Sequence, residues 1–177
     1  MVNYITGNDS NNVLNGTNNR DRLYGYGGSD SLIGYGGNDA LFGGSGSDFL
    51  LGGDGIDWLQ GGTGSSSTND RDILDGGRDT WTDYYVLGNQ TSSYYTGSGY
   101  ATLRNFNPAY DYIVVADNFS TARITLSLGQ ISGSSAADTL IRMNGDLVGV
   151  VEDVNIANMS LSVNFIRSNR VNQAIWT

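Results

Sequence analysis

Five aspartates in the first third of the chain recur at a fixed interval. They are Asp21, Asp30, Asp39, Asp48 and Asp57, each nine residues after the one before. Paired carboxylates can act as acid and base in glycoside hydrolysis, and carboxylates also serve as hard oxygen ligands for Ca²⁺ or Mg²⁺. The regular spacing therefore raises two kinds of chemistry, and the rest of the composition helps to decide between them.

The composition removes most other catalytic chemistry. The chain has no His, Cys or Lys and a single glutamate, Glu152, so that 17 of its 18 acidic residues are Asp. Without these residues there is no Ser-His-Asp or Cys-His pair, no Schiff base, no phosphate-binding P-loop lysine and no soft-ligand zinc or copper site. We therefore expect no enzyme, and a carboxylate-dependent hydrolase ranks last because Glu152 has no evident partner.

The net charge of −9 bears on the partners of the protein. It argues against nucleic acid and anionic membranes, which attract clustered cations, and it suits a cationic partner. The amino terminus lacks the basic and apolar regions of a general secretory signal peptide, and no segment approaches the length of a membrane span. We therefore predict no nucleic acid partner and no membrane span.

The residues around the acids keep the same nine-residue interval. In phase with the acids are leucines at positions 14, 23, 32, 41, 50 and 59 and glycines at positions 7, 16, 25, 34, 43, 52 and 61. Gly/Asp/Ser-rich composition alone is typical of a disordered linker. A linker has no reason to keep an apolar residue two positions after an acid for six units, so we interpret x-Leu-x as a short strand and the glycine-rich residues before it as a turn.

Each unit is then a turn plus a strand that reverses the chain, and two units make a coil of eighteen residues. Coils of this kind stack with parallel strands about 4.8 Å apart. Stacking places Asn12, Asp30 and Asp48 in one column and Asp21, Asp39 and Asp57 in another, and it sets Leu14, Leu32 and Leu50 against Leu23, Leu41 and Leu59. The sequence predicts a flat spiral of two sheets with a thin leucine core.

Stacked carboxylates oppose their own folding. Two unit charges about 4 Å apart repel by about 1 kcal/mol in water and about 4 kcal/mol at an effective dielectric constant of about 20. Arginines are not interleaved at the right places, so we expect a metal ion held by carboxylate oxygens and by the carbonyls of the glycine-rich turns. Flexible all-oxygen coordination favours Ca²⁺ over Mg²⁺, which demands small octahedral geometry and keeps its water.

Four consecutive units carry a recognisable motif. Written as GYGGSDSLI, GYGGNDALF, GGSGSDFLL and GGDGIDWLQ, they resemble the G-G-x-G-x-D-x-U-x nonapeptide of RTX (repeats-in-toxin) proteins, the hemolysin-type calcium-binding repeats. The resemblance covers roughly residues 7–88. It implies an all-β fold in which residues 1–88 form a parallel β-roll, a right-handed solenoid of two sheets that binds several Ca²⁺ ions.

In that family each ion lies between turns one coil apart. The earlier unit supplies its Asp and the carbonyls of positions two and four, and the later unit supplies its Asp and the carbonyls of positions one and three. Carried over, three main sites are Tyr26, Gly28 and Asp30 with Gly43, Ser45 and Asp48; Thr17, Asn19 and Asp21 with Gly34, Gly36 and Asp39; and Tyr35, Gly37 and Asp39 with Gly52, Asp54 and Asp57.

Both ends of the repeat depart from the pattern. Asn12 replaces the first Asp. Inserted residues after Gly61 and Gly76 delay the later acids to Asp72 and Asp83, and Leu74 and Tyr85 then take the inward positions. The resemblance then implies a weaker site of Asn12 with Gly25, Gly27 and Asp30, a further site of Gly44, Gly46 and Asp48 with Gly61, Thr63 and Asp72, and, as remaining candidate ligands, Gly53, Gly55 and Asp83. Asp70 and Asp79 in the insertions are equally well extra ligands or solvated turn acids.

The second half, residues 89–177, is rich in aromatic and β-branched residues. Segments such as YATLRNF, DYIVVADNF, DTLIRM and LVGVVEDV predict strands separated by Asn/Gly/Ser turns. We expect a β-rich domain that caps the open end of the spiral, and its order loosely resembles the segment that follows RTX repeats in secreted bacterial proteins. Asp111 is either a further ligand or a turn acid, and the tail FIRSNRVNQAIWT is either a carboxy-terminal export signal or a last strand.

Side chains beside the inward leucines point outward. Ile33, Phe49 and Leu51 lie on one sheet, and Tyr24, Phe42 and Trp58 lie on the other. Exposed apolar rows of this kind usually have a cover. We favour the second half or a second copy of the chain as the cover over a sugar or protein ligand.

Two functions compete. The first is a secreted or cell-surface module, exported by a type I secretion apparatus, whose roll folds on meeting extracellular Ca²⁺. The second is a calcium-scaffolded adhesion protein that recognises a glycan or a surface layer. Both a complete small protein and the end of a larger exported enzyme or toxin fit the sequence.

Overall fold

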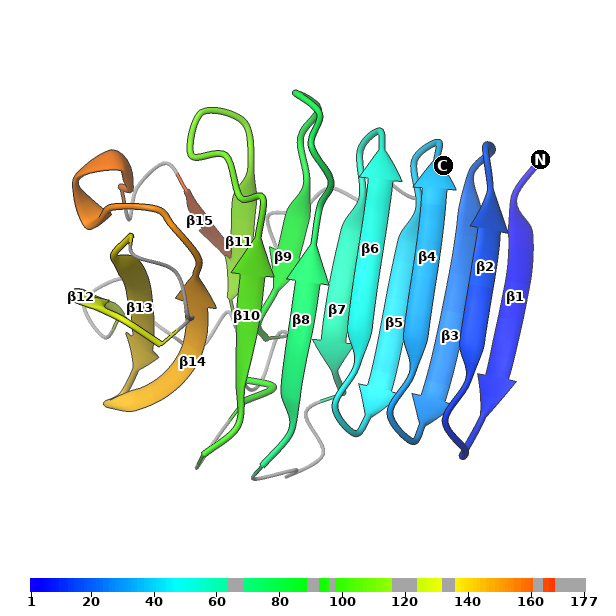
Figure 1. The fold of residues 1–177 in the computed structure, drawn as a ribbon, viewed down its shortest axis with the longest axis horizontal. Helices are drawn as coiled ribbons and strands as arrows, with labels where there is room; N and C mark the ends of the chain where they lie inside the picture. Colours follow the sequence, from blue (N-terminus) through cyan, green and yellow to red (C-terminus); the bar gives the residue numbers. More distant parts are fainter. Residues whose placement is uncertain are drawn as a thin grey trace.

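Two β-sheets lie back to back along the molecule (Figure 1). The computed structural model describes residues 1–63, 69–88, 93–95, 98–115, 124–131, 136–160 and 164–167. The first sheet runs in the order β1 (Asn3–Asn8), β3 (Asp21–Gly27), β5 (Ala40–Ser45), β7 (Trp58–Gly62), β9 (Tyr84–Val86), β11 (Tyr112–Val115) and β15 (Phe165–Arg167). The second sheet runs in the order β12 (Ile124–Gly129), β13 (Asp138–Met143), β14 (Asp146–Val151), β10 (Tyr100–Arg104), β8 (Arg71–Asp75), β6 (Phe49–Asp54), β4 (Ser31–Gly36) and β2 (Val13–Thr17).

The chain alternates between the sheets, so each coil contributes one strand to either side. Neighbouring strands from β1 to β11 and from β2 to β10 are parallel, as a spiral requires. In the regular part, Leu14 pairs with Leu32 and Leu23 with Leu41, a step of eighteen residues. This two-sheet parallel solenoid confirms the predicted fold class.

The insertions do not disturb the register. Leu50 pairs with Leu74 and Leu59 pairs with Tyr85, so the longer coils still bring their inward residues into line. The inserted residues lengthen the connections between strands. Parallel pairing fixes which residues lie opposite one another, whereas the turns can vary in length. The positions predicted for Leu74 and Tyr85 are therefore observed.

The core is a narrow row of side chains between the sheets. The six leucines and Tyr85 that follow one another along it are Leu23, Leu32, Leu41, Leu50, Leu59, Leu74 and Tyr85, and all of them have no exposed surface. One apolar residue per strand suffices because each sheet presents only one face to the other. Glycines fill the turns, where the coils approach most closely.

Both sheets continue past residue 88, although the nine-residue motif ends near there. Leu103 of β10 lies opposite Leu74, and Ile113 of β11 lies opposite Tyr85. Leu103 and Ile113 are fully buried, so inward apolar residues extend the coils without the Gly/Asp motif. The predicted domain boundary at residue 88 stays a prediction.

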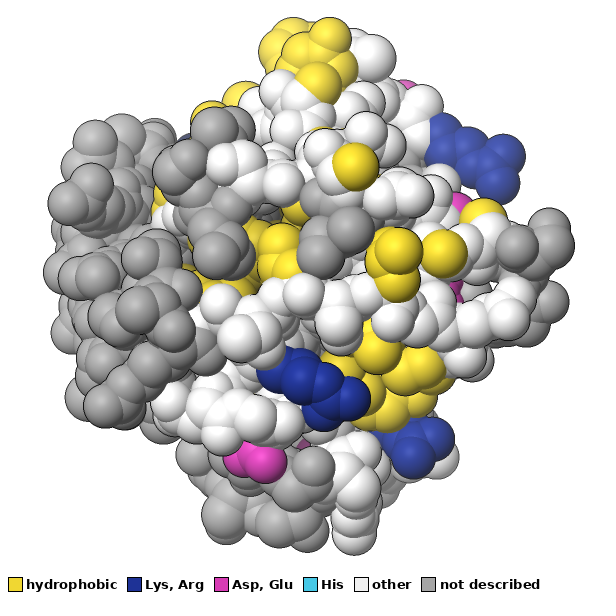
Figure 2. Space-filling model, turned by 90° about the vertical axis from the view of Figure 1, so that its left-hand side faces the viewer, with side chains coloured by type: hydrophobic (Ala, Val, Ile, Leu, Met, Phe, Trp, Pro, Cys, Tyr) yellow, Lys and Arg dark blue, Asp and Glu magenta, His cyan; other side chains and the backbone are white. Residues whose placement is uncertain are grey.

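The far end of the molecule is antiparallel. β12, β13 and β14 form a meander that lengthens the second sheet beyond β10, and a short 3₁₀ helix, η2 (Ile156–Asn158), follows it. Seen from this end, apolar side chains are visible between polar ones (Figure 2). Among the described residues, no helix has the length and apolarity needed to cross a membrane.

Candidate metal centre

The turns between strands have an unusual backbone that aims carbonyl groups at the next coil. Tyr26 and Tyr35, at position two of their units, both have φ = 76°, and Gly28 and Gly37, at position four, have φ of 93° and 109°. Tyrosine rarely adopts positive φ, because its Cβ crowds the backbone there. Strained residues of this kind often mark functional sites.

The glycines of the following coil show where these carbonyls point. A Cβ on Gly44 would overlap the Tyr26 carbonyl, and a Cβ on Gly46 would overlap the Gly28 carbonyl. In the same way, Gly53 and Gly55 lie against the carbonyls of Tyr35 and Gly37, respectively. Position-two and position-four carbonyls, which the sequence named as ligands, therefore face the neighbouring turn.

Two continuous columns of acids run along the edges of the roll. In each column, the backbone N–H at the acid position donates to the Oδ1 atom of the acid one coil further on. The pairs, donor first, are Asn12 and Asp30, Asp21 and Asp39, Asp30 and Asp48, Asp39 and Asp57, Asp48 and Asp72, Asp57 and Asp83, and Asp83 and Asp111, with distances of 2.7–3.0 Å. Asp72 and Asp83 thus lie where the sequence placed them, despite the insertions.

The second carboxylate oxygen of the central acids has no protein partner. Within the described part of the chain, the Oδ2 atoms of Asp30, Asp39, Asp48 and Asp57 are buried and accept no hydrogen bond. A buried polar atom without a partner costs roughly 1–3 kcal/mol, and more when it is charged. Four such atoms in two columns indicate that these acids need a proton or a cation.

Burial changes the protonation of the acids. Burial raises the pKa of Asp39 and Asp48 to about 7 and that of Asp57 to about 8; a backbone hydrogen bond opposes this shift, and repulsion by neighbouring aspartates adds to it. Burial likewise raises the pKa of Asp83 to about 9. The charged carboxylate is therefore unfavourable in this fold unless a positive charge replaces the lost water.

Carbonyl groups of the next coil lie close to two of these unpartnered Oδ2 atoms. A Cβ on Gly25 would overlap both Asp30 Oδ2 and the Gly43 carbonyl oxygen, and a Cβ on Gly34 would overlap both Asp39 Oδ2 and the Gly52 carbonyl oxygen. Two acceptors that face one point fit a hard cation between them. In these two predicted sites the structure therefore brings an acid close to one predicted carbonyl of the next coil, and beside Gly16 it does the same for Asp21 Oδ2 and the Gly34 carbonyl oxygen.

The third main site, around Asp21, differs. Asp21 Oδ2 accepts hydrogen bonds from the Thr17 amide at 2.6 Å and the Thr17 hydroxyl at 3.0 Å, and Asn3 Nδ2 donates to Asp21 Oδ1 at 2.6 Å. The protein itself therefore satisfies both oxygens. Asn12 is similar, because its Oδ1 accepts from the Asn8 amide at 2.8 Å. The amino-terminal sites consequently have less need of an ion than the central ones.

The two acids in the insertions lie against turns of the preceding coil. The Asp70 carboxylate accepts from the Gly46 amide at 3.0 Å, and the Asp79 carboxylate accepts from the Gly55 amide at 2.7 Å. In the regular coil, the corresponding Gly37 amide donates to the position-three carbonyl of Asp54 at 2.9 Å. Asp70 and Asp79 therefore stand where a turn carbonyl stands elsewhere, whereas the predicted ligand Thr63 is exposed.

Two features were missed or left open by the sequence. Asp111 continues the second column, and its Oδ2 accepts from the Asn107 amide four residues earlier, as Asp21 does from Thr17. This spacing of four is a signal that could have assigned Asp111. The second feature is Tyr95, whose hydroxyl donates to Asp72 Oδ2 at 2.6 Å. The sequence contains no signal for it, because Tyr95 lies in a segment without the repeat.

Acid clusters of the usual kind are absent from the described residues. No three acidic side chains there lie close enough together to hold a metal ion. The three main predicted sites contain two carboxylates and four carbonyls each, so they do not require such a cluster. Their ligand sets as a whole stay predictions.

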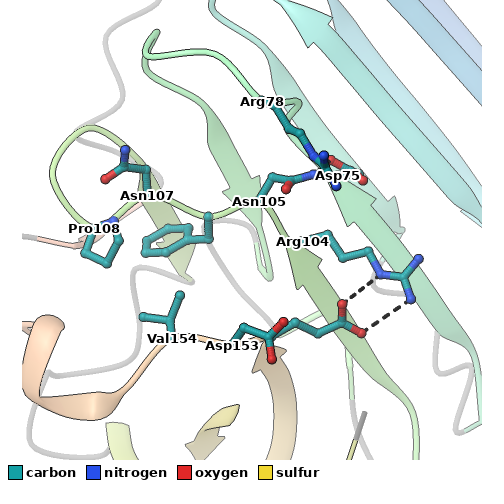
Figure 3. Close-up of a pocket in the computed structure, with 10 residues that line it drawn as sticks. Asp75, Arg78, Arg104, Asn105, Asn107, Pro108, Asp153 and Val154 are labelled. Carbon is teal, nitrogen blue, oxygen red and sulfur yellow. Dashed lines mark hydrogen bonds and ion pairs between the residues drawn. The ribbon is translucent and has the colours of Figure 1, made fainter. Parts of the chain in front are cut away.

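A separate polar hollow of about 660 Å³ lies beside the last coils (Figure 3). Arg104 and Glu152 form an ion pair at 2.9 Å across it, and Asn105 donates to Asp75 at 2.6 Å. Glu152, which seemed to lack a partner, is therefore paired with an arginine and not with a second acid.

The outward side of the first sheet carries a row of aromatic side chains. Tyr24 stacks on Phe42 with ring centroids 4.9 Å apart, and Tyr84 lies 6.0 Å from Trp58 and 5.7 Å from Tyr112. Trp58 keeps only 9% of its surface exposed, so it is less accessible than the sequence suggested. The nature of the cover stays a prediction.

Comparisons with known proteins agree with the repeat and with the fold. The family model described as RTX calcium-binding nonapeptide repeat (4 copies) matches residues 3–23, 15–50 and 42–80. The solution structure of the AlgE6R3 subunit from the Azotobacter vinelandii mannuronan C5-epimerase is similar at 24% identity, with a TM-score of 0.50, over 95% of this chain and 83% of that one. This likeness concerns the fold. No curated protein sequence matches the chain.

Proposed function

Because residues 3–80 belong to the RTX calcium-binding nonapeptide repeat family, we propose that the chain is a secreted calcium-binding module whose roll folds around several Ca²⁺ ions after export. The observation that carries the proposal is the set of four buried oxygens without a partner, on Asp30, Asp39, Asp48 and Asp57. Those of Asp30 and Asp39 also lie close to a carbonyl oxygen of the next coil, Gly43 and Gly52, respectively. A hard divalent cation satisfies all of these acceptors at once.

The chain's own groups prepare these sites. The backbone N–H groups of the acid positions fix one oxygen of each carboxylate, which leaves the other aimed into the turn. The positive φ values at Tyr26 and Tyr35 and at the position-four glycines turn carbonyls toward the next coil. A bound Ca²⁺ ion would supply the positive charge that these acceptors lack.

The same electrostatics suggest a switch. Without calcium, the carboxylate columns repel, and an open chain suits passage through a type I secretion channel. At extracellular calcium concentrations, binding free energy becomes folding free energy. Sites of such extracellular modules have dissociation constants on the order of 10⁻⁴ to 10⁻³ M, and stacked coils make their binding cooperative.

Asp48→Asn tests the proposal at a single acid. In chelator, the variant should melt at the same or a higher temperature than the wild type, because it removes a buried charge. In saturating calcium it should melt at a lower temperature, and half-saturation should require about tenfold more calcium, equivalent to about 1.4 kcal/mol. Calorimetry and calcium titration measure both effects.

Asp146→Asn is the matched control, because Asp146 is exposed in the β13–β14 hairpin. It should leave both melting temperatures and the calcium titration unchanged. A loss of stability in Asp48→Asn that is the same with and without calcium would contradict the proposal, since the acid would then act only through its protein contacts.

A second candidate function is recognition of a polysaccharide on a calcium scaffold. It is favoured by the exposed aromatic rings, because Tyr4, Tyr26 and Tyr35 keep 64%, 55% and 51% of their surface. Sugars commonly bind on exposed aromatic faces. Sedimentation with an insoluble acidic or neutral polysaccharide in calcium would support it if Tyr4→Ala lost binding while remaining folded, and absence of binding by the wild type would count against it.

A further inference from the structure

One acid of the columns has a partner that its neighbours lack. The Tyr95 hydroxyl donates to Asp72 Oδ2 at 2.6 Å, and both residues are at least 99% buried. Asp30 and Asp48 lie in the same column, and their Oδ2 atoms accept nothing from the described protein. At Asp72, therefore, the second carboxylate oxygen of the column receives a hydrogen bond from the protein.

The position of this hydroxyl can be compared directly between coils. Beside Gly25, Asp30 Oδ2 faces the Gly43 carbonyl oxygen, and beside Gly61, Asp72 Oδ2 faces the Tyr95 hydroxyl. Two acceptors that lie this close, with no donor on the carboxylate oxygen, call for a proton or a cation between them. An acceptor that faces a donor does not, because the hydrogen bond itself compensates the carboxylate charge.

Tyr95 is held firmly in this place. Its amide donates to the Ser93 hydroxyl at 3.3 Å, the Ser93 hydroxyl donates to the Tyr95 carbonyl at 3.0 Å, and the Tyr94 amide donates to the Leu87 carbonyl at 2.9 Å. The Tyr95 ring belongs to the main apolar core together with Leu74. The segment that follows β9 thus delivers a donor to the end of the column.

We propose that Tyr95 ends the metal column on this edge of the roll: its hydroxyl takes the place of an ion on the carboxy-terminal side of Asp72. The inference rests on the proposed function, since it presupposes ions between the earlier coils. It explains how a roll of repeated cation sites can continue into coils without the motif, because the last acid is compensated by the protein.

The tyrosine nearest the other column does not share this role. The Tyr85 hydroxyl donates to the Arg104 carbonyl at 2.8 Å and accepts from the Gly76 amide at 3.1 Å. Its proton is therefore used by a backbone carbonyl. The second column instead continues to Asp111, whose Oδ2 is satisfied by the Asn107 amide.

The test compares Tyr95→Phe with Tyr94→Phe, which makes the same change one residue away. Bound calcium is counted by native mass spectrometry, and the melting temperature is measured in chelator and in saturating calcium. Tyr95→Phe should bind as many ions as the wild type and melt about 4–8 °C lower under both conditions. Tyr94→Phe should resemble the wild type, because no described contact involves its hydroxyl.

A loss in Tyr95→Phe that disappears in saturating calcium would overturn the inference, since an ion would then satisfy Asp72 in the loaded protein. An unchanged melting temperature in both conditions would also overturn it. If the wild type binds no calcium but Tyr95→Phe is still destabilised, the proposed function fails while the hydrogen bond stands, so the two failures are distinguishable.

Asp72→Asn serves if Tyr95→Phe does not fold. The amide oxygen still accepts from Tyr95, whereas the charge that faces Asp48 is gone. The variant should remain folded in chelator and bind one ion fewer than the wild type. A full complement of ions in Asp72→Asn would contradict the placement of the last ion between Asp48 and Asp72.

Discussion

At the scale of single residues, the aspartates combine two roles that usually exclude each other. One oxygen of each central carboxylate accepts a hydrogen bond from a backbone N–H of the preceding coil, and the other is buried without a partner. The first role stabilises the stack, and the second destabilises it until a proton or a cation arrives. The balance between these roles makes the roll sensitive to its ionic surroundings.

The pKa values predict an unusual pH dependence without calcium. Burial raises the pKa of Asp39, Asp48 and Asp57 to about 7, 7 and 8, whereas the unfolded value is 3.8. The folded state then binds more protons than the unfolded state, so its stability falls as the pH rises from about 4 to about 8. In chelator, the melting temperature should therefore be higher at pH 5 than at pH 8, because the protonated acids stabilise the fold only at the lower pH.

The control for this prediction is the same pair of measurements in saturating calcium. Bound cations favour the charged carboxylates, so the advantage of low pH should shrink or reverse. A melting temperature in chelator that rises between these two pH values would show that the acids are stably ionised in the metal-free fold.

At the scale of the elements, the turn is the part that determines the site. Gly44 and Gly46 have φ of 115° and 118° and touch carbonyl groups of the preceding turn. Strands contribute one inward side chain each, and turns contribute the oxygens. The glycine-rich composition is therefore a requirement of close backbone approach as well as of φ.

Gly46→Ala should separate these two requirements when it is compared with Gly145→Ala. Both glycines have positive φ, but a Cβ on Gly145 meets nothing within 4 Å, whereas a Cβ on Gly46 would overlap the Gly28 carbonyl. We expect Gly145→Ala to cost about 1–2 kcal/mol from φ alone and Gly46→Ala to cost clearly more. Denaturant unfolding in calcium measures both costs. Equal losses in the free energy of unfolding would mean that the turn shifts to accommodate the added methyl group.

Sequence periodicity predicted the regular coils and the positions of the acids, because every unit needs the same tight turn, acid and inward apolar residue. Asp72 and Leu74 were placed correctly across an insertion, since the acid and the inward leucine keep their mutual spacing of two. Tyr95 could not be found in this way, because its contact joins residues 23 apart through an irregular segment. The continuation of both sheets past residue 88 escaped for the same reason.

At the scale of the whole molecule, the coils change along the roll: the first carry the Gly/Asp motif, and the last are stabilised by inward apolar side chains without it. Asp21 and Asn12 at one end, and Asp72 and Asp111 at the other, receive hydrogen bonds from the protein itself. Within the described ranges, the buried carboxylate oxygens without a hydrogen-bond partner all lie in the middle coils. The ends of the roll are therefore compensated by their own contacts, and the proposed ions are needed in the middle coils.

Calcium titration of chelator-treated protein, followed by circular dichroism and hydrodynamic radius with Mg²⁺ as control, tests the central claim most directly. The account predicts a cooperative gain of β signal with compaction for Ca²⁺ alone, at a concentration on the order of 10⁻⁴ to 10⁻³ M. A protein that is already compact and β-rich in chelator, and unchanged by calcium, would contradict it.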